Sequence, residues 1–138
     1  MSNGLTNEYV ERLGRKLLGK KFKGVYPCDS KPLMKKYKFI IFNESKHNEE
    51  GTHFVAFGMK KNLIFYFDSL GKSLSNIYLK KFVKSLKKKC ICVLNYPIQS
   101  DDSFFCGLFC IAFLLSLKNN DLTFLSRLNV PNILNNND

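Results

Sequence analysis

Cys106 stands where a polar loop meets a long apolar run, in the stretch QSDDSFFCGLFCIAFLL from Gln99 to Leu115. A thiol at the first turn of a helix meets the positive end of the helix dipole and unpaired backbone N–H groups, which favour the thiolate. The thiolate is the reactive form, so Cys106 is a candidate nucleophile. Gly107 would let a substrate backbone approach, at a cost in helix propensity. The alternative is that Cys106 is a small buried residue, like Cys110 one turn later.

A cysteine nucleophile needs a base, and the chain has two histidines. His47 lies in the polar run NESKHNEEG, which is typical of a solvated loop. His53 begins the apolar segment THFVAF, from which its imidazole could project into a cleft. Asp68 ends the next apolar segment, LIFYFD, and the ends of two antiparallel strands meet across a hairpin. Asp68 could therefore orient His53, although an aspartate in DSLG also fits a simple turn.

Gln99 completes a pattern that could catalyse acyl transfer. Such a reaction needs hydrogen-bond donors aimed at the developing oxyanion, and a glutamine amide together with the Cys106 backbone N–H would supply them. A loop glutamine alone carries little information. The order His53, Asp68, Gln99, Cys106 is what makes the set a candidate for nucleophilic catalysis.

The apolar patterning predicts the elements that would position these residues. Helical spacing predicts a helix over 6–18 behind a Thr6 or Asn7 cap, a second over 75–88, a long apolar helix from about Cys106 and a short one over 122–128. Strands are predicted over 36–42, 52–59, 62–68 and 90–96, and a loop over 24–32. The pattern indicates one α+β domain spanning residues 1–138.

Composition limits the classes of protein to which the chain can belong. With 138 residues, 45% of them hydrophobic, it can bury one core. The apolar run from Phe104 to Leu117 is too short to cross a membrane, so we expect no membrane partner. Five cysteines without a secretory signal indicate an intracellular protein with reduced thiols. A zinc site drawn from Cys90, Cys92, Cys106 and Cys110 lacks the paired CxxC knuckles of structural zinc, and we predict no metal.

The net charge of +11 predicts an affinity for polyanions. Much of the excess lies on the expected helix over 75–88, whose polar face carries Lys80, Lys84, Lys87 and Lys88. A polyanion is the predicted partner of these four lysines. The alternatives are a solvated face on a lysine-rich chain, and a basic nucleic-acid binder without enzymatic activity, which would leave the His53, Asp68, Gln99 and Cys106 pattern unexplained.

Taken together, GTHFVAF, FDSLG and QSDDSFFCGLFCIAFLL resemble the adenovirus-type cysteine proteases (adenain), which share a clan with the ubiquitin-like-protein proteases. The tail VPNILN is similar to the segment that follows the nucleophile helix in adenovirus enzymes. The resemblance covers roughly residue 24 to the C-terminus. The compact length and the lysine- and asparagine-rich composition suggest a virophage or a polinton-like virus, of a Mavirus-like kind.

The resemblance implies an adenain-like α+β fold, in which a central, mostly antiparallel sheet packs against a buried helix that carries the nucleophile at its N-terminus. It implies that Cys106 is the nucleophile, His53 the base and then the acid, Asp68 the orienter and Gln99 the oxyanion donor. Substrate-binding roles are expected for Asp29, Phe54 and Gly107. Phe54 stands where the family frequently has tryptophan, which implies a smaller aromatic lid.

The implied function is that of a viral cysteine endopeptidase that cleaves capsid or other virion precursor proteins at glycine-containing sites during maturation. The chemistry needs no cofactor, and activation by DNA or by a viral peptide is an expected addition. The resemblance also makes the viral genome the expected polyanion of Lys80, Lys84, Lys87 and Lys88, bound as a duplex through its phosphates without sequence readout. We expect a monomer, located in the virion and, during assembly, in the host cytoplasm or nucleus. The alternative is a protease that removes ubiquitin-like modifiers from host proteins, because it would use the same four residues.

Overall fold

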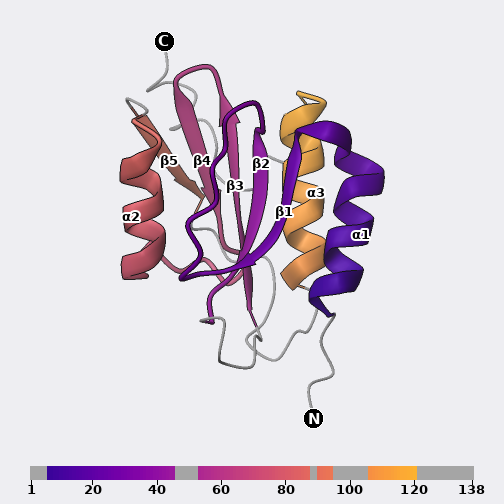
Figure 1. Cartoon of the computed structure of the whole chain (residues 1–138), viewed down its shortest axis with the longest axis horizontal. Helices are drawn as coiled ribbons and strands as arrows, with labels where there is room; N and C mark the ends of the chain where they lie inside the picture. The colour runs from indigo at the N-terminus through magenta and orange to yellow at the C-terminus, as the bar shows by residue number, and fades with distance from the viewer. Residues whose placement is uncertain (1–5, 46–52, 88–89, 95–105, 121–138) are drawn as a thin grey trace.

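The computed structural model describes residues 6–45, 53–87, 90–94 and 106–120 (Figure 1). Within these residues one sheet has the strand order β1-β2-β3-β4-β5. The strands are β1 (Phe22–Pro27), β2 (Phe39–Asn43), β3 (Phe54–Lys60), β4 (Leu63–Phe67) and β5 (Cys90–Leu94). The helices are α1 (Asn7–Leu18), α2 (Ile77–Ser85) and α3 (Cys106–Lys118), with a 3₁₀ turn over Gly19–Lys21. This α+β arrangement confirms the predicted fold class.

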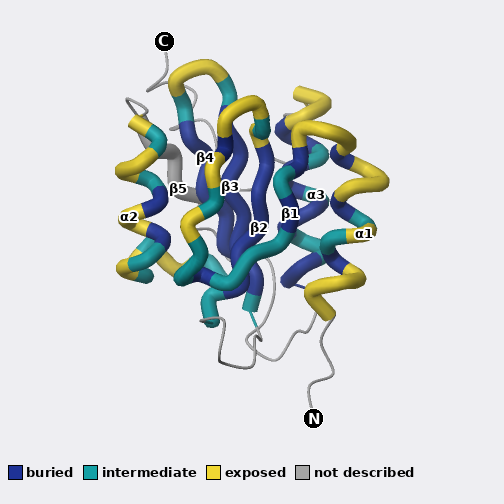
Figure 2. Tube along the Cα trace, viewed as in Figure 1, coloured by how far each residue is buried: buried dark blue, intermediate teal, exposed yellow. Residues whose placement is uncertain are grey.

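Helices cover both faces of the sheet. Figure 1 shows α1 and α3 on one side and α2 on the other, and α3 packs on β3 while α1 packs on β1 and on α3. The apolar side chains accordingly form two clusters, one on each face of the sheet. In Figure 2 β2, β3 and β4 are mostly buried, β1 is largely half-buried, and exposed positions lie on the outer helix faces and the turns. This sandwich holds the ends of β3, β4 and α3 in fixed relation.

Helix α1 begins and ends at residues that satisfy its free backbone groups. The Thr6 hydroxyl accepts a hydrogen bond from the Tyr9 N–H at 3.1 Å, and the chain leaves the helix at Gly19 with φ of 75°. Glycine adopts this left-handed conformation without a Cβ penalty. The predicted cap and the predicted extent of this helix are therefore confirmed.

The sheet is mixed, and the expectation of a mostly antiparallel sheet needs correction at its edges. Strands β2, β3 and β4 pair antiparallel, whereas β1 pairs with β2 and β4 pairs with β5 in parallel. The helix α2 connects β4 to β5 and returns the chain to the same end of the sheet. Such a crossover places consecutive strands in parallel.

The predicted loop over 24–32 is wrong for residues 24–27, which belong to β1, and is confirmed for residues 28–32. Gly24 and Pro27 both weaken a strand pattern, but β1 is an edge strand, where a missing N–H and an irregular residue are tolerated. Gly24 has φ of 136°, and the pairing register of β1 with β2 shifts between Phe22 and Val25. The glycine therefore absorbs an irregularity in the strand.

Helix α3 lies very close to the sheet at Gly58. A Cβ built on Gly58 would lie 2.4 Å from Leu117 Cδ2 and 3.2 Å from Leu114 Cδ2. The missing side chain lets the apolar helix approach β3 and fixes its distance from the sheet. No helix within the described ranges has the length and apolar character needed to cross a membrane. The predicted short helix over 122–128 lies outside those ranges.

Candidate active site

Three chain segments meet at the end of the sheet where α3 begins. His53 immediately precedes β3, Asp68 immediately follows β4, and Cys106 is the first residue of α3. The β3–β4 hairpin places His53 Nε2 2.7 Å from Asp68 Oδ1, and the His53 ring also forms a hydrogen bond with the Cys106 side chain. We call these three side chains the catalytic cluster. The described structure thus brings together three of the four residues expected to be catalytic.

Asp68 is held by its own backbone turn. Its side chain is 1% exposed, and its Oδ1 accepts both the His53 contact and the Leu70 N–H at 2.9 Å. The turn hydrogen bond that the sequence allowed as an alternative is therefore present together with the histidine contact. Among the described residues, no hydrogen-bond donor reaches Asp68 Oδ2. The carboxylate is buried and oriented toward the imidazole.

The environment of His53 favours the imidazolium. Burial lowers the pKa of His53. The hydrogen bonds to Asp68 and Cys106 and the charges of both groups outweigh this effect and raise the pKa to about 10. Because Nε2 faces Asp68, we assign Nδ1 to the contact with the thiol. In the charged form both ring nitrogens donate, one to a carboxylate and one to sulfur. This geometry suits a thiolate–imidazolium pair.

Glu44 is a second carboxylate beside His53 that the sequence analysis missed. Its Oε1 lies 3.8 Å from His53 Nε2, and its backbone N–H donates to the His53 carbonyl at 2.9 Å. Burial raises the pKa of Glu44 and the His53 charge opposes this rise. Glu44 follows β2 in the polar run NESKHNEEG, which looks like a solvated loop in the sequence. Its position directly after an apolar strand was the available signal.

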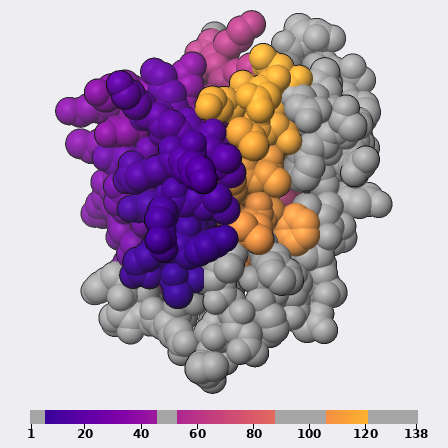
Figure 3. Space-filling view, turned by 90° about the vertical axis from the view of Figure 1, so that its right-hand side faces the viewer, coloured from indigo at the N-terminus to yellow at the C-terminus, as the bar shows by residue number. Residues whose placement is uncertain are grey.

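Cys106 and the glycine after it are packed closely against neighbouring elements. Its Sγ accepts the Phe54 backbone N–H at 3.4 Å, and the residue is 3% exposed. Figure 3 shows α3 emerging at the surface beside α1. A Cβ built on Gly107 would lie 2.7 Å from Val10 Cγ2 of α1. The thiol of Cys110 differs, because complete burial raises its pKa and keeps it neutral.

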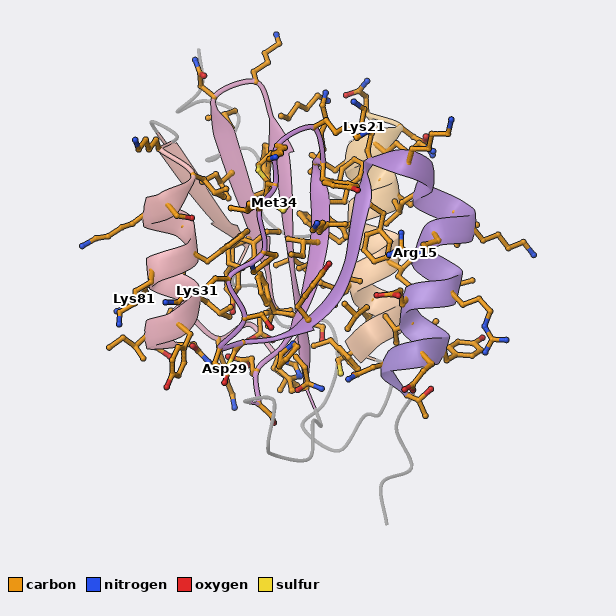
Figure 4. The ribbon with its side chains drawn as sticks, in the orientation of Figure 1. Arg15, Lys21, Asp29, Lys31, Met34 and Lys81 are labelled. Atoms are coloured by element: carbon orange, nitrogen blue, oxygen red, sulfur yellow. The ribbon has the colours of Figure 1, made fainter. Side chains whose placement is uncertain are left out.

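The structure changes the reading of the three residues assigned to substrate binding. Phe54 is 3% exposed and lies in the core cluster with Val10 and Cys106, so its N–H, and not its ring, faces the site. Gly107 is buried, and the group that approaches it closely is Val10. Asp29 lines a pocket of about 320 Å³ beside α2, together with Lys31 and Lys81, both labelled in Figure 4. A substrate-binding role for Asp29, Phe54 and Gly107 stays a prediction.

The remaining expected site residues divide into described and undescribed positions. Lys80, Lys84 and Lys87 are exposed on α2 and the turn after it. Gln99, His47 and Lys88 lie outside the described residues.

Among the described residues, one group of side chains at this end of the sheet could hold a metal ion. Glu44, His53 and Asp68 each offer a ligand atom, and these atoms lie within 4.8 Å of one another. One imidazole and two carboxylates can bind a divalent ion such as zinc. Because the imidazole already contacts Asp68 at 2.7 Å, a metal here would displace the proton that this contact holds.

Comparison with known proteins identifies the fold. No protein-family model and no curated protein sequence matches the chain. Among solved structures it is similar to an ASFV protease, with 17% identity and a TM-score of 0.58 over 86% of this chain and 59% of that one. It is also similar to the C-terminal Ulp1 protease domain in complex with SMT3, the yeast orthologue of SUMO, with 17% identity and a TM-score of 0.52 over 85% and 66%.

A further solved structure is the SUMO protease Ulp1 with its catalytic cysteine oxidised to a sulfenic acid. It has 18% identity to this chain and a TM-score of 0.50, over 85% of this chain and 67% of that one. The chain covers 59% of the ASFV protease, which is less than two thirds of its length. The architecture, with Cys106 at the start of α3, is the Ulp1-like cysteine protease fold.

Proposed function

We propose that this chain is a cysteine endopeptidase with Cys106 as nucleophile, His53 as base and then acid, and Asp68 as the group that orients the imidazole. The observation that supports the proposal is the single imidazole that contacts a buried carboxylate at 2.7 Å and a thiol at a helix start. These groups come from three separate segments. A thiol, an imidazole and a carboxylate arranged in this way on this fold can catalyse peptide hydrolysis.

The proposed reaction proceeds in two steps. The Cys106 sulfur attacks the peptide carbonyl carbon, and the carbonyl π electrons move to oxygen. Collapse of this intermediate breaks the C–N bond, and the His53 imidazolium gives its proton to the leaving amine, which leaves a thioester. His53 then takes a proton from water, the hydroxide attacks the thioester carbonyl, and the thiolate leaves. We assign the oxyanion donors to the Cys106 backbone N–H and the Gln99 amide.

We propose virion precursor proteins, cut at glycine-containing sites, as the substrates. This rests on the resemblance of the three motifs to adenovirus-type enzymes and on the fold shared with a viral protease. The fold is also shared with a SUMO protease, so removal of a ubiquitin-like modifier is the competing substrate class. Both classes present a peptide bond next to glycine to the same catalytic cluster.

The activity test uses a proteome-derived peptide library incubated with the purified chain, with the new termini identified by mass spectrometry. Wild type should cut, and Cys106→Ala should leave the library intact. Cys28→Ala is the matched control, because Cys28 is also buried, at 2% exposure, yet lies in the other core cluster. Equal losses from both variants would indicate folding damage and would contradict the assignment.

The substrate class is tested separately with two intact proteins. One is a capsid precursor from a virophage or polinton-like virus, and the other is a SUMO fused through its C-terminal glycine to a reporter. Cleavage of the precursor alone supports the maturation function. Cleavage of the fusion alone would replace it with the modifier-removing function, while Cys106 would remain the nucleophile.

We also propose that α2 binds duplex DNA through its lysines. Lys80, Lys84 and Lys87 are exposed together on this helix and the turn that follows it. Contacts with phosphates release counterions, so binding should weaken steeply between about 50 and 200 mM salt. Fluorescence anisotropy with two unrelated duplexes measures this dependence. Binding that is indifferent to salt would contradict the phosphate contacts.

A further inference from the structure

A second concave surface lies at the opposite end of the sheet from the catalytic cluster. It has a volume of about 560 Å³ and is lined by Lys21, Lys35, Lys36, Lys38 and Lys61, with Met34 and Met59 among its apolar residues. We call it the lysine pocket. Lys38 directly precedes β2 and Lys61 lies in the β3–β4 turn, whereas His53 precedes β3. The seven residues of β3 separate the two sites by about 20 Å.

The pocket is strongly cationic. All five lysines are exposed at its rim, and among the described residues that line it there is no carboxylate. Five positive charges around one cavity repel one another, and a multiply charged anion would relieve that repulsion. In Figure 4 Lys21 and Met34 lie toward the hairpin end of the molecule, and Asp29 lies toward the other end.

Two of these lysines occupy backbone conformations that lysine rarely adopts. Lys35 has φ of 39° and Lys61 has φ of 57°, both in the left-handed region. Glycine or asparagine would occupy such turns with less strain. A turn that only reverses the chain does not need a lysine. Lysine at these two positions places two ammonium groups beside the pocket. Strained residues of this kind gather at ligand sites.

The wall of the pocket is braced by backbone hydrogen bonds. The Lys38 N–H donates to the Lys21 carbonyl and the Met59 N–H donates to the Lys38 carbonyl, each at 2.8 Å. Lys21 Nζ also donates to the Lys36 carbonyl at 3.4 Å. Beneath the rim, Met34 and Met59 are 5% and 7% exposed. The site is therefore formed before a ligand arrives, which lowers the entropy cost of binding.

We propose that the lysine pocket binds a small, multiply phosphorylated molecule. Phosphate oxygens are strong acceptors for lysine ammonium groups, and the volume is that of a small-molecule site. A concave site of this size favours a compact ligand over a duplex, whose phosphates are spread along a rod. Two sources share this chemistry: inorganic polyphosphate, which has only the charge, and a nucleotide, whose base would lie on the methionine floor. The proposal does not depend on peptidase activity.

The test is isothermal titration calorimetry of the whole chain with sodium tripolyphosphate and, separately, with ATP. The pocket variant is Lys36→Gln with Lys38→Gln. The control is Arg12→Gln with Lys16→Gln on α1, which removes the same charge from exposed positions outside the pocket. We expect wild type to bind tripolyphosphate, the pocket variant to bind on the order of tenfold more weakly, and the control to stay within about twofold of wild type.

The source of the ligand follows from the second titration. Tighter binding of ATP than of tripolyphosphate assigns the pocket to a nucleotide, and tighter binding of tripolyphosphate assigns it to a polyphosphate. The charge-preserving variant Lys36→Arg with Lys38→Arg should retain binding. Absence of tripolyphosphate binding to wild type, or equal weakening by the pocket and α1 variants, would overturn the proposal. Binding of duplex DNA with no binding of either small ligand would also overturn it.

Discussion

Replacing Asp68 by asparagine tests whether the carboxylate keeps His53 charged. With a His53 pKa of about 10, about 99% of molecules carry the imidazolium at pH 8. Without the Asp68 charge the pKa returns toward its ordinary value of 6.5, where about 3% carry it at that pH. A full return to that value would lower kcat/KM at pH 8 by about 30-fold through the loss of the ion pair alone. Loss of the imidazole's orientation adds to this decrease.

The assay is a pH profile of kcat/KM for wild type and Asp68→Asn with a peptide identified from the library. The wild-type profile should fall as pH rises through about 10, when His53 loses its proton. In the variant this decline should begin several pH units lower, and the difference between the two enzymes should shrink in acid. A variant profile that still declines near pH 10 would refute the role assigned to Asp68.

A stability control accompanies this profile. Asparagine places an NH₂ group where Asp68 Oδ2 lies buried without a described donor. If the new donors find no acceptor, unfolding becomes easier by about 1–3 kcal/mol. Activities should therefore be compared well below the melting temperature of the variant.

Three further predictions follow from the described contacts. Glu44→Gln should lower kcat/KM by no more than about fivefold, because its 3.8 Å pair with His53 is partly solvated; a loss as large as that of Asp68→Asn would make Glu44 the principal orienter. Because the pKa of His53 is raised in the folded state, its contribution to stability is complete below about pH 6.5 and is lost as pH rises through about 10. Denaturant titrations should therefore show stability declining across this window in wild type and not in His53→Gln. Gly58→Ala should lower the free energy of unfolding by about 1–3 kcal/mol, because its Cβ would overlap Leu117, and an unchanged urea midpoint would contradict this packing.

Local patterning predicted most of the elements. The apolar alternation over 52–59 and 62–68 anticipates the β3–β4 hairpin, and the hairpin in turn places His53 beside Asp68. Strand β1 was missed, because Gly24 and Pro27 interrupt its pattern and only its edge position makes them acceptable. Parallel pairing is a property of the connections between strands, which a residue pattern does not contain.

The candidate catalytic residues are more predictable than their surroundings. Cys106 and His53 have chemistry that few other residue types can supply, so their types and order are informative. Phe54, Gly107 and Glu44 have types that serve many purposes, and their roles depend on what packs against them. Val10 lies far from Gly107 in sequence, and only the tertiary structure shows that these two residues touch.

The contacts that build the catalytic cluster differ in sequence separation, with a consequence for biosynthesis. His53 and Asp68 are 15 residues apart, whereas the Phe54 contact to the Cys106 sulfur spans 52 residues. During synthesis the histidine and its carboxylate can therefore pair while the nucleophile is still unmade. Local contacts also form faster than distant ones. A nascent chain on the ribosome would carry a prepared base with nothing to activate, and the proposed hydrolytic activity would begin only when α3 docks against the sheet.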